Sequence, residues 1–186
     1  MGFSQEDESE KPEAAWENPV LVIVRGIKYN ESYKMLTGGI CMGSYLNPGS
    51  RSFEMALASE IFIDKSLLIE KTNRMIGTLQ RFVCVSRPRR FGKSMAADML
   101  AAYYGSGKDT STLFDSLKIS GCKTYRQNLN QYDVLKINMQ EFMSATNSMD
   151  EMISVLQQRI LEDLKRQYPV QVMGDNLIFA MQDIYA

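Results

Sequence analysis

The residues best suited to do chemistry lie in the segment RPRRFGKS, which occupies positions 87–94. Its last three residues, Gly92-Lys93-Ser94, complete the phosphate-binding pattern G-x-x-x-x-G-K-[ST]. In that pattern, backbone N–H groups and the dipole of the following helix hold phosphate oxygens. The lysine reaches the β- and γ-phosphates, and the hydroxyl binds Mg²⁺. The segment therefore predicts a nucleotide-binding loop with Lys93 on phosphate and Ser94 on the metal.

The first half of this loop departs from the pattern. Arg87 stands where the leading glycine is expected, and Pro88 removes one backbone donor. The arginines can compensate, because a guanidinium group matches phosphate geometry with two parallel hydrogen bonds. The same cations also suit nucleic acid, so a nucleic-acid-binding or regulatory module is the alternative. The candidate binding residues are Arg87, Pro88, Arg89, Arg90, Phe91, Gly92, Lys93 and Ser94.

Two elements must position the loop. The β-branched and aromatic run Arg81–Ser86 predicts a buried strand before it. Apolar spacing predicts a helix over 93–104 after it, with Gly105 as the stop. Alternation within 131–139 predicts a second strand. This order of elements predicts an α/β fold, a partial P-loop NTPase in which helices flank a partly parallel sheet.

Further elements surround this unit. The sequence predicts a short strand within 19–29, a short helix over 52–60, and a helix from about residue 67 with Ser66 as its N-cap. An amphipathic helix is predicted from Ser148 to the residues before Pro169. A last helix is predicted from Leu177, capped by Asp175 or Asn176.

Composition narrows the classes of function. The chain has 186 residues, a net charge of -1, three cysteines and no histidine. The lack of histidine excludes His-based triads and His-containing zinc sites, and the odd, widely spaced cysteines indicate a reduced protein. No apolar run reaches the roughly 18 residues that span a bilayer. We therefore expect a cytoplasmic protein that does not insert into membranes.

The first 41 residues differ from the rest of the chain. Residues 1–18 are acidic and polar, which predicts disorder. Thr37-Gly38-Gly39 can be encoded by a purine tract of the kind that bacterial ribosomes bind, and Met42 follows after a short spacer. One hypothesis is that translation starts at Met42 and that 1–41 are upstream sequence. The other is that 1–41 form a genuine extension of a domain at 42–186.

Several segments resemble the predicted AAA-ATPase-like family of prokaryotic P-loop proteins. The resemblance rests on FIDKSLLI (62–69) and VSRPRRFGKSMAADML (85–100), and extends over about residues 42–186. In that family RPRRFGKS replaces the glycine-first loop, so the resemblance implies binding of ATP and Mg²⁺ through an intact variant of Walker A. Asp64 and Lys65 match the family's Asp-Lys element, either as a strand end and a surface charge or with a role at the nucleotide.

The acidic half of the catalytic machinery is not found in the sequence. Hydrolysis needs an acidic residue at the end of a later strand to hold Mg²⁺ and the attacking water. In the family this strand ends in Asp-Glu, and a nuclease-like domain often follows. We expect this chain to be an N-terminal portion that stops before the Walker B strand, with weak or absent hydrolysis. Exposed sheet edges would then favour self-association.

Overall fold

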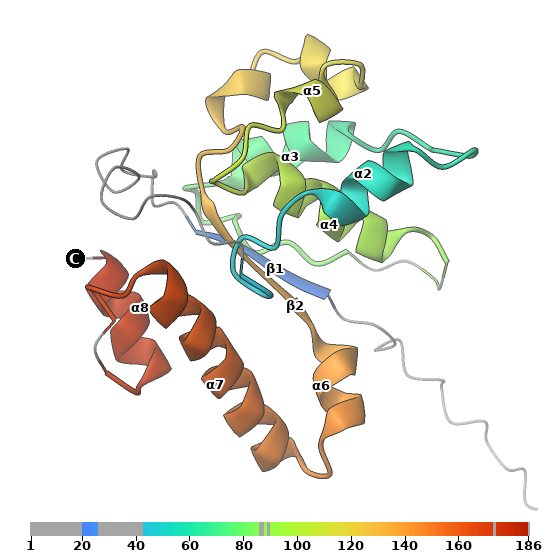
Figure 1. The fold of residues 1–186 in the computed structure, drawn as a ribbon. Helices are drawn as coiled ribbons and strands as arrows, with labels where there is room; N and C mark the ends of the chain where they lie inside the picture. The colour runs from blue at the N-terminus through green and yellow to red at the C-terminus, as the bar shows by residue number, and fades with distance from the viewer. Residues whose placement is uncertain (1–19, 26–42, 86–87, 89, 173, 186) are drawn as a thin grey trace, which may run out of the picture.

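The computed structural model describes residues 20–25, 43–85, 88, 90–172 and 174–185, with only the backbone given for 20–25 and for Tyr185. The fold is mixed and rich in helix (Figure 1). Its elements are β1 (Val20–Arg25), α2 (Arg51–Leu57), α3 (Leu67–Met75), α4 (Lys93–Tyr104), α5 (Ser111–Phe114), η1 (Lys118–Gly121), η2 (Tyr125–Gln127), β2 (Asp133–Asn138), α6 (Met139–Ala145), α7 (Met149–Gln167) and α8 (Leu177–Tyr185).

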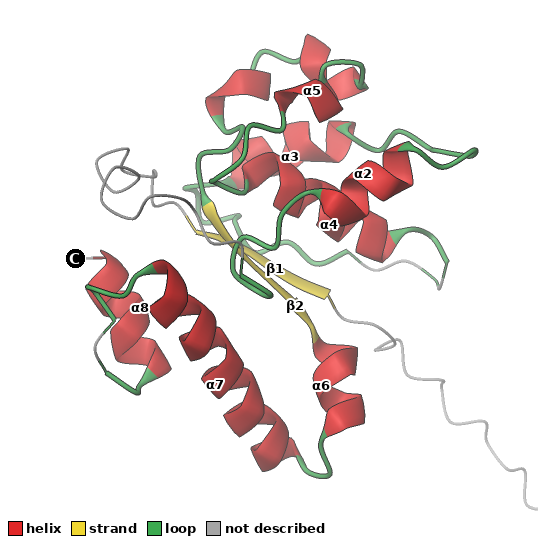
Figure 2. Cartoon of the chain, viewed as in Figure 1, coloured by secondary structure: helices red, strands yellow, loops and turns green. Residues whose placement is uncertain are grey.

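The two strands form an antiparallel pair in which Val20 lies opposite Asn138 and Arg25 lies opposite Asp133 (Figure 2). This confirms the short strand predicted within 19–29 and the strand predicted within 131–139. The predicted parallel sheet is not seen in the described residues, where the one parallel element is an isolated bridge between Gly105 and Tyr132. The predictions of disorder at 1–18 and of a start at Met42 fall outside these residues.

The second edge of β2 is also occupied. The carbonyl of Tyr45 accepts a hydrogen bond from the N–H of Lys136, and the N–H of Asn47 donates to the carbonyl of Val134. Successive residues of a strand direct their N–H and C=O groups to opposite edges. The segment 45–47 therefore lies on one edge of β2 and β1 on the other.

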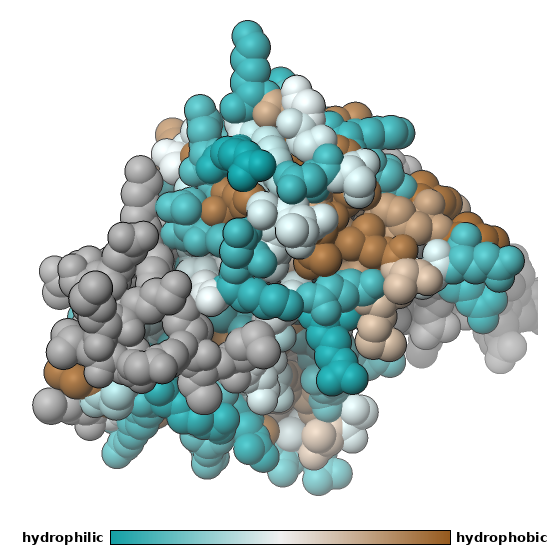
Figure 3. All heavy atoms as spheres, turned by 45° about the horizontal axis from the view of Figure 1, so that its top comes forward, coloured by the Kyte–Doolittle hydropathy of each residue, from teal (hydrophilic) through white to brown (hydrophobic). Residues whose placement is uncertain are grey.

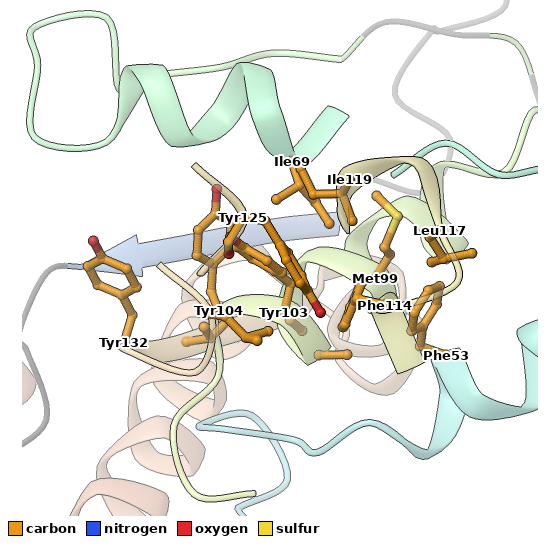
Figure 4. Close-up of a cluster of buried hydrophobic side chains, with 14 residues drawn as sticks. Phe53, Ile69, Met99, Tyr103, Tyr104, Phe114, Leu117, Ile119, Tyr125 and Tyr132 are labelled. Atoms are coloured by element: carbon orange, nitrogen blue, oxygen red, sulfur yellow. The ribbon is translucent and has the colours of Figure 1, made fainter. Parts of the chain in front are cut away.

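Alternation along β2 separates two hydrophobic cores. Val134 belongs to the core beneath α2–α5, and Figure 4 shows its aromatic centre, with Tyr103, Tyr104, Phe114 and Tyr125 side by side. Leu135 and Ile137 belong to the core formed with α6–α8. Figure 1 shows these two groups of helices on opposite sides of the strand pair. Side chains on both faces of β2 are thus buried.

Most of the predicted helices are confirmed with their caps. α4 spans the predicted residues and ends at Gly105. Ser148 caps α7 by accepting a hydrogen bond from the N–H of Glu151 (3.2 Å), and Asn176 caps α8 by accepting from Ile178 and Phe179. Ser66 precedes α3, but its hydroxyl makes no cap hydrogen bond there. Of the helices that the structure describes, none is long and apolar enough to cross a bilayer.

The strand predicted at Arg81–Ser86 is wrong for Arg81–Val85, and Ser86 lies outside the described residues. The segment has no strand hydrogen bonds, and Phe82 is 83% exposed. The physical reason is that both edges of β2 are occupied, by β1 and by residues 45–47. Ile61 and Ile63, which precede α3, are also exposed apolar side chains. Figure 3 shows hydrophobic surface on one side of the molecule, and this is the side on which Figure 1 shows the loop between α2 and α3.

Candidate phosphate-binding site

The start of α4 forms the centre of the candidate site. Gly92 is its N-cap residue and has a left-handed backbone (φ 76°, ψ 33°), and its carbonyl accepts the first helical hydrogen bond, from Ala96 (3.0 Å). No side chain caps this end, and the first turn carries no acidic residue. The first N–H groups of the helix therefore keep their hydrogen-bonding capacity and the positive end of the dipole. Lys93 is half-buried there, and Ser94 is exposed.

The described part of the preceding loop is open to solvent. Pro88 and Arg90 are exposed, and the ring of Phe91 is 59% exposed. Arg90 also has a left-handed backbone (φ 65°), which is uncommon for a residue with a Cβ. Two left-handed residues, Arg90 and Gly92, thus flank Phe91 and turn the chain sharply into the helix. The predicted site residues Arg87 and Arg89 lie outside the described residues.

Lys65 contacts this loop from the segment before α3. Its Nζ atom donates a hydrogen bond to the carbonyl of Phe91 (2.6 Å). A Cβ atom added to Gly92 would lie 2.8 Å from the same Nζ atom. The absence of a side chain at residue 92 therefore serves two purposes, the left-handed turn and the close approach of the Lys65 ammonium group.

Asp64 faces in another direction and has a structural role. One carboxylate oxygen accepts from the N–H of Ser66 (2.8 Å) and the other from the N–H of Lys118 (2.9 Å), while the hydroxyl of Ser66 accepts from Ile119 (3.1 Å). Burial raises the pKa of Asp64, but the hydrogen bonds from Ser66 and Lys118 outweigh it, so the pKa lies below its ordinary value. Asp64 and Ser66 thus join the start of α3 to η1, which fixes the segment that carries Lys65.

The body of α4 is held firmly, which gives the loop a rigid base. Asp98 forms a half-buried ion pair with Lys136 of β2. Tyr103 and Tyr104 are fully buried at the end of the helix (Figure 4). The hydroxyl of Tyr104 donates a hydrogen bond to Asn73 of α3 (2.7 Å). Burial raises the pKa of Tyr103 to about 12. These phenols therefore stay neutral hydrogen-bonding groups of the core.

A pocket lies at the other end of α4. It has a cavity volume of about 230 Å³ and is lined by Asn47, Gly49, Ser50, Ala101, Ala102, Gly105, Ser106, Gly107, Lys108 and Thr110. Its one charged lining group, Lys108, pairs with Glu54 (3.0 Å). Because the pocket contains neither the helix N-terminus nor the Gly-Lys-Ser sequence, we place the candidate site at the loop and not in this cavity.

The described residues form no cluster of metal-binding side chains. Within the described part of the chain, no group of three Cys, Asp or Glu side chains is arranged to hold a metal ion. Asp163 is 2% exposed and accepts from the N–H groups of Tyr45 (2.7 Å) and Leu46 (3.2 Å), far along the chain from the loop. The role of Ser94 as a metal ligand therefore remains a prediction from its place in the motif.

Comparisons with curated proteins and with solved structures gave no match. The sequence profile of a protein family described as "Predicted AAA-ATPase" matches residues 49–185. The matched region includes the Asp64-Lys65 pair, the loop, α4 and β2, and extends to the end of α8. The chain belongs to this predicted AAA-ATPase family.

Proposed function

We propose that this chain binds ATP together with Mg²⁺ through the loop 87–94. The observation that carries the proposal is the start of α4, where left-handed Gly92 leads into an uncapped helix beginning with Lys93 and Ser94. Membership of the predicted AAA-ATPase family indicates nucleotide binding in general. The donors present fit a polyphosphate, because they combine free N–H groups, a helix dipole and an ammonium group in one turn.

In this proposal each described residue has a distinct task. Gly92 turns the chain so that the first N–H groups of α4 face the phosphates, and Lys93 neutralises their charge. The exposed hydroxyl of Ser94 would hold Mg²⁺, which neutralises charge between the β- and γ-phosphates when it is bound. Arg90 adds a cation at the entrance of the loop.

We further propose that hydrolysis is weak or absent. Phosphoryl transfer to water needs an acidic residue beside the metal. The more buried aspartates are engaged elsewhere: Asp98 pairs with Lys136, Asp133 accepts from Asn47 (2.7 Å), and Asp163 holds residues 45 and 46. ATP binding without efficient turnover is the behaviour that this arrangement supports.

The test is a fluorescence titration of Mg-ATP with parallel measurement of phosphate release. Lys93→Ala should weaken ATP binding by at least about tenfold, because a charge-assisted contact contributes roughly 1.5–3 kcal/mol. The wild type should bind ATP more tightly in Mg²⁺ than in EDTA, and Ser94→Ala should remove this difference in ATP affinity. Lys71→Ala, at an exposed position on α3, is the matched control and should bind like the wild type. Unchanged ATP binding by Lys93→Ala would contradict the proposed site. Robust phosphate release by the wild type that is lost in Lys93→Ala would contradict the proposal that hydrolysis is weak or absent.

We also propose that residues 81–86 become a strand of a parallel P-loop sheet when an edge of β2 is free. Deleting residues 1–41 removes β1, which occupies one edge. The amides of Phe82–Val85 should then exchange hydrogen more slowly than in the full chain. Equal exchange in both chains would refute this proposal.

Sequencing the N-terminus of protein made from the native gene tests the start at Met42, and an N-terminus at Met1 would contradict it.

Nucleic-acid binding is the second candidate function, and the exposure of Arg90 and Phe91 favours it. An exposed aromatic ring beside a cation offers a base both a stacking surface and a phosphate contact. Binding of a single-stranded oligonucleotide should then fall steeply with salt and should be insensitive to ATP. Competition between ATP and the oligonucleotide for the loop would instead support the nucleotide site.

A further inference from the structure

Lys65 and Lys93 differ from the other two partly buried lysines of the described chain, Lys136 and Lys165. Lys136 pairs with Asp98, and Lys165 pairs with Asp175 (2.5 Å), so each has a carboxylate to balance its charge. Lys65 is also partly buried, but the contact that the described residues give its ammonium group is the neutral carbonyl of Phe91. An ammonium group without an anionic partner attracts an incoming anion.

The neighbouring acid does not supply that partner. Both carboxylate oxygens of Asp64 are occupied by backbone N–H groups, those of Ser66 and Lys118. These bonds direct Asp64 toward η1, whereas Lys65 reaches the loop before α4. An ammonium group has three N–H donors, and the bond to Phe91 uses one. Two donors of Lys65 therefore remain for a ligand.

The place of the ammonium group identifies the ligand. Its Nζ atom lies 2.6 Å from the carbonyl of Phe91, against Gly92, and hence at the residue that begins the phosphate-binding turn. The chain thus supplies cations to this turn from two segments far apart in sequence, Lys65 before α3 and Lys93 at the start of α4. A ligand that satisfies both must carry more than one negative charge, as the β- and γ-phosphates of a nucleotide do.

We propose that Lys65 is a second phosphate-binding lysine, which contacts the polyphosphate of the bound nucleotide directly. The proposal rests on the proposed function and assigns a residue outside the Gly-Lys-Ser motif to the same site. It also explains the pairing of Asp64 with Lys65: the aspartate fixes the segment to η1, and the lysine crosses to the loop.

The experiment measures Mg-ATP affinity at two salt concentrations for Lys65→Gln and Lys65→Arg. Lys65→Gln should weaken ATP binding about tenfold, since one charge-assisted hydrogen bond is lost. Its affinity should also depend less on salt, because one screened ionic contact is missing. Lys65→Arg keeps the charge and should bind within about threefold of the wild type. Lys71→Gln is the control, and thermal unfolding should show that all variants are folded.

The outcomes separate this proposal from the proposed function. Unchanged ATP affinity in Lys65→Gln, with binding lost in Lys93→Ala, would overturn the role of Lys65 and leave the site in place. Weaker binding with an unchanged salt dependence, not restored by arginine, would show that Lys65 only positions the loop, and would also overturn the proposal. If the wild type binds no ATP at all, the proposed function itself fails.

Discussion

Replacement of Gly92 by alanine tests the geometry of the loop. The backbone at this residue is left-handed, and a Cβ atom would lie 2.8 Å from the Nζ atom of Lys65. A left-handed backbone costs about 1–2 kcal/mol for a residue other than glycine. The clash itself is relieved cheaply, because Nζ is the end of a flexible side chain, but the hydrogen bond to Phe91 is then lost.

These two terms set the expected magnitude. An exposed hydrogen bond contributes about 0.5–1 kcal/mol, so Gly92→Ala should lower the free energy of unfolding by about 1.5–3 kcal/mol in total. If the loop relieves this strain by adopting another backbone conformation, it must return to the original one to bind ATP. The free energy of that change then lowers the affinity for ATP. Each 1.4 kcal/mol is tenfold in affinity, so ATP binding should weaken by about tenfold or more.

The chain offers two matched controls for this variant. Gly77 has the same left-handed backbone (φ 77°), but a Cβ atom there meets nothing within 4 Å. Gly121 has neither the left-handed backbone nor a neighbour within 4 Å. Gly77→Ala should therefore lose stability but bind ATP normally, whereas Gly121→Ala should change neither property.

The assay combines urea denaturation with titration of Mg-ATP. Normal ATP binding by Gly92→Ala would refute the reasoning, because the turn would then not need its observed backbone. An equal loss of affinity in Gly77→Ala would refute it as well, since the effect would reflect general destabilisation.

Three further predictions concern stability and association. Asp163→Ala should lower the free energy of unfolding by about 2–4 kcal/mol in urea denaturation, because it leaves the buried N–H groups of residues 45 and 46 without an acceptor; a loss below 0.5 kcal/mol would contradict this anchor. Since the folded pKa of Asp64 is depressed, its contribution to stability is present above the unfolded pKa of about 3.9 and is lost as the pH falls through the folded value. Asp64→Asn should therefore flatten the acid limb of the stability profile, and an unchanged limb would exclude this role. We also propose self-association through residues 81–85, so replacing Phe82 and Val85 by serine should lower the apparent mass in light scattering at high concentration, while an unchanged mass would exclude this surface.

Local signals made the helices predictable. α4 and α7 have apolar spacing, and their ends are fixed by neighbouring residues such as Gly105 and Ser148. The hydrogen bonds of a helix and its caps connect residues within one or two turns, so the sequence alone contains the relevant information. The same holds for Gly92, whose position before a helix predicts the turn.

The pairing of strands depended on competition between distant segments. Arg81–Val85 has the composition of a buried strand, yet β1 and residues 45–47 occupy the edges of β2. The composition of a segment indicates that it can form a strand, but not which of several candidate segments pairs with a given edge of β2. The predicted strand failed for this reason and not because its residues are unsuitable for a sheet.

The same limit applies to the candidate site. The contact between Lys65 and Phe91 joins residues 26 positions apart, and no local pattern announces it. The anchor between Asp163 and residues 45 and 46 joins helix α7 to a loop more than one hundred positions earlier. In the sequence, Asp163 reads as a polar residue of an amphipathic helix, and its burial follows only from the packing of the second core.

The central claim is that nucleotide binds at the start of α4. Hydrogen exchange with and without Mg-ATP tests this claim most directly, because it reports which amides become protected. The amides from Phe91 to Ala96 should exchange more slowly with Mg-ATP, and this protection should be lost in Lys93→Ala. Protection confined to the pocket residues Gly105–Thr110, or no protection anywhere in the chain, would contradict it.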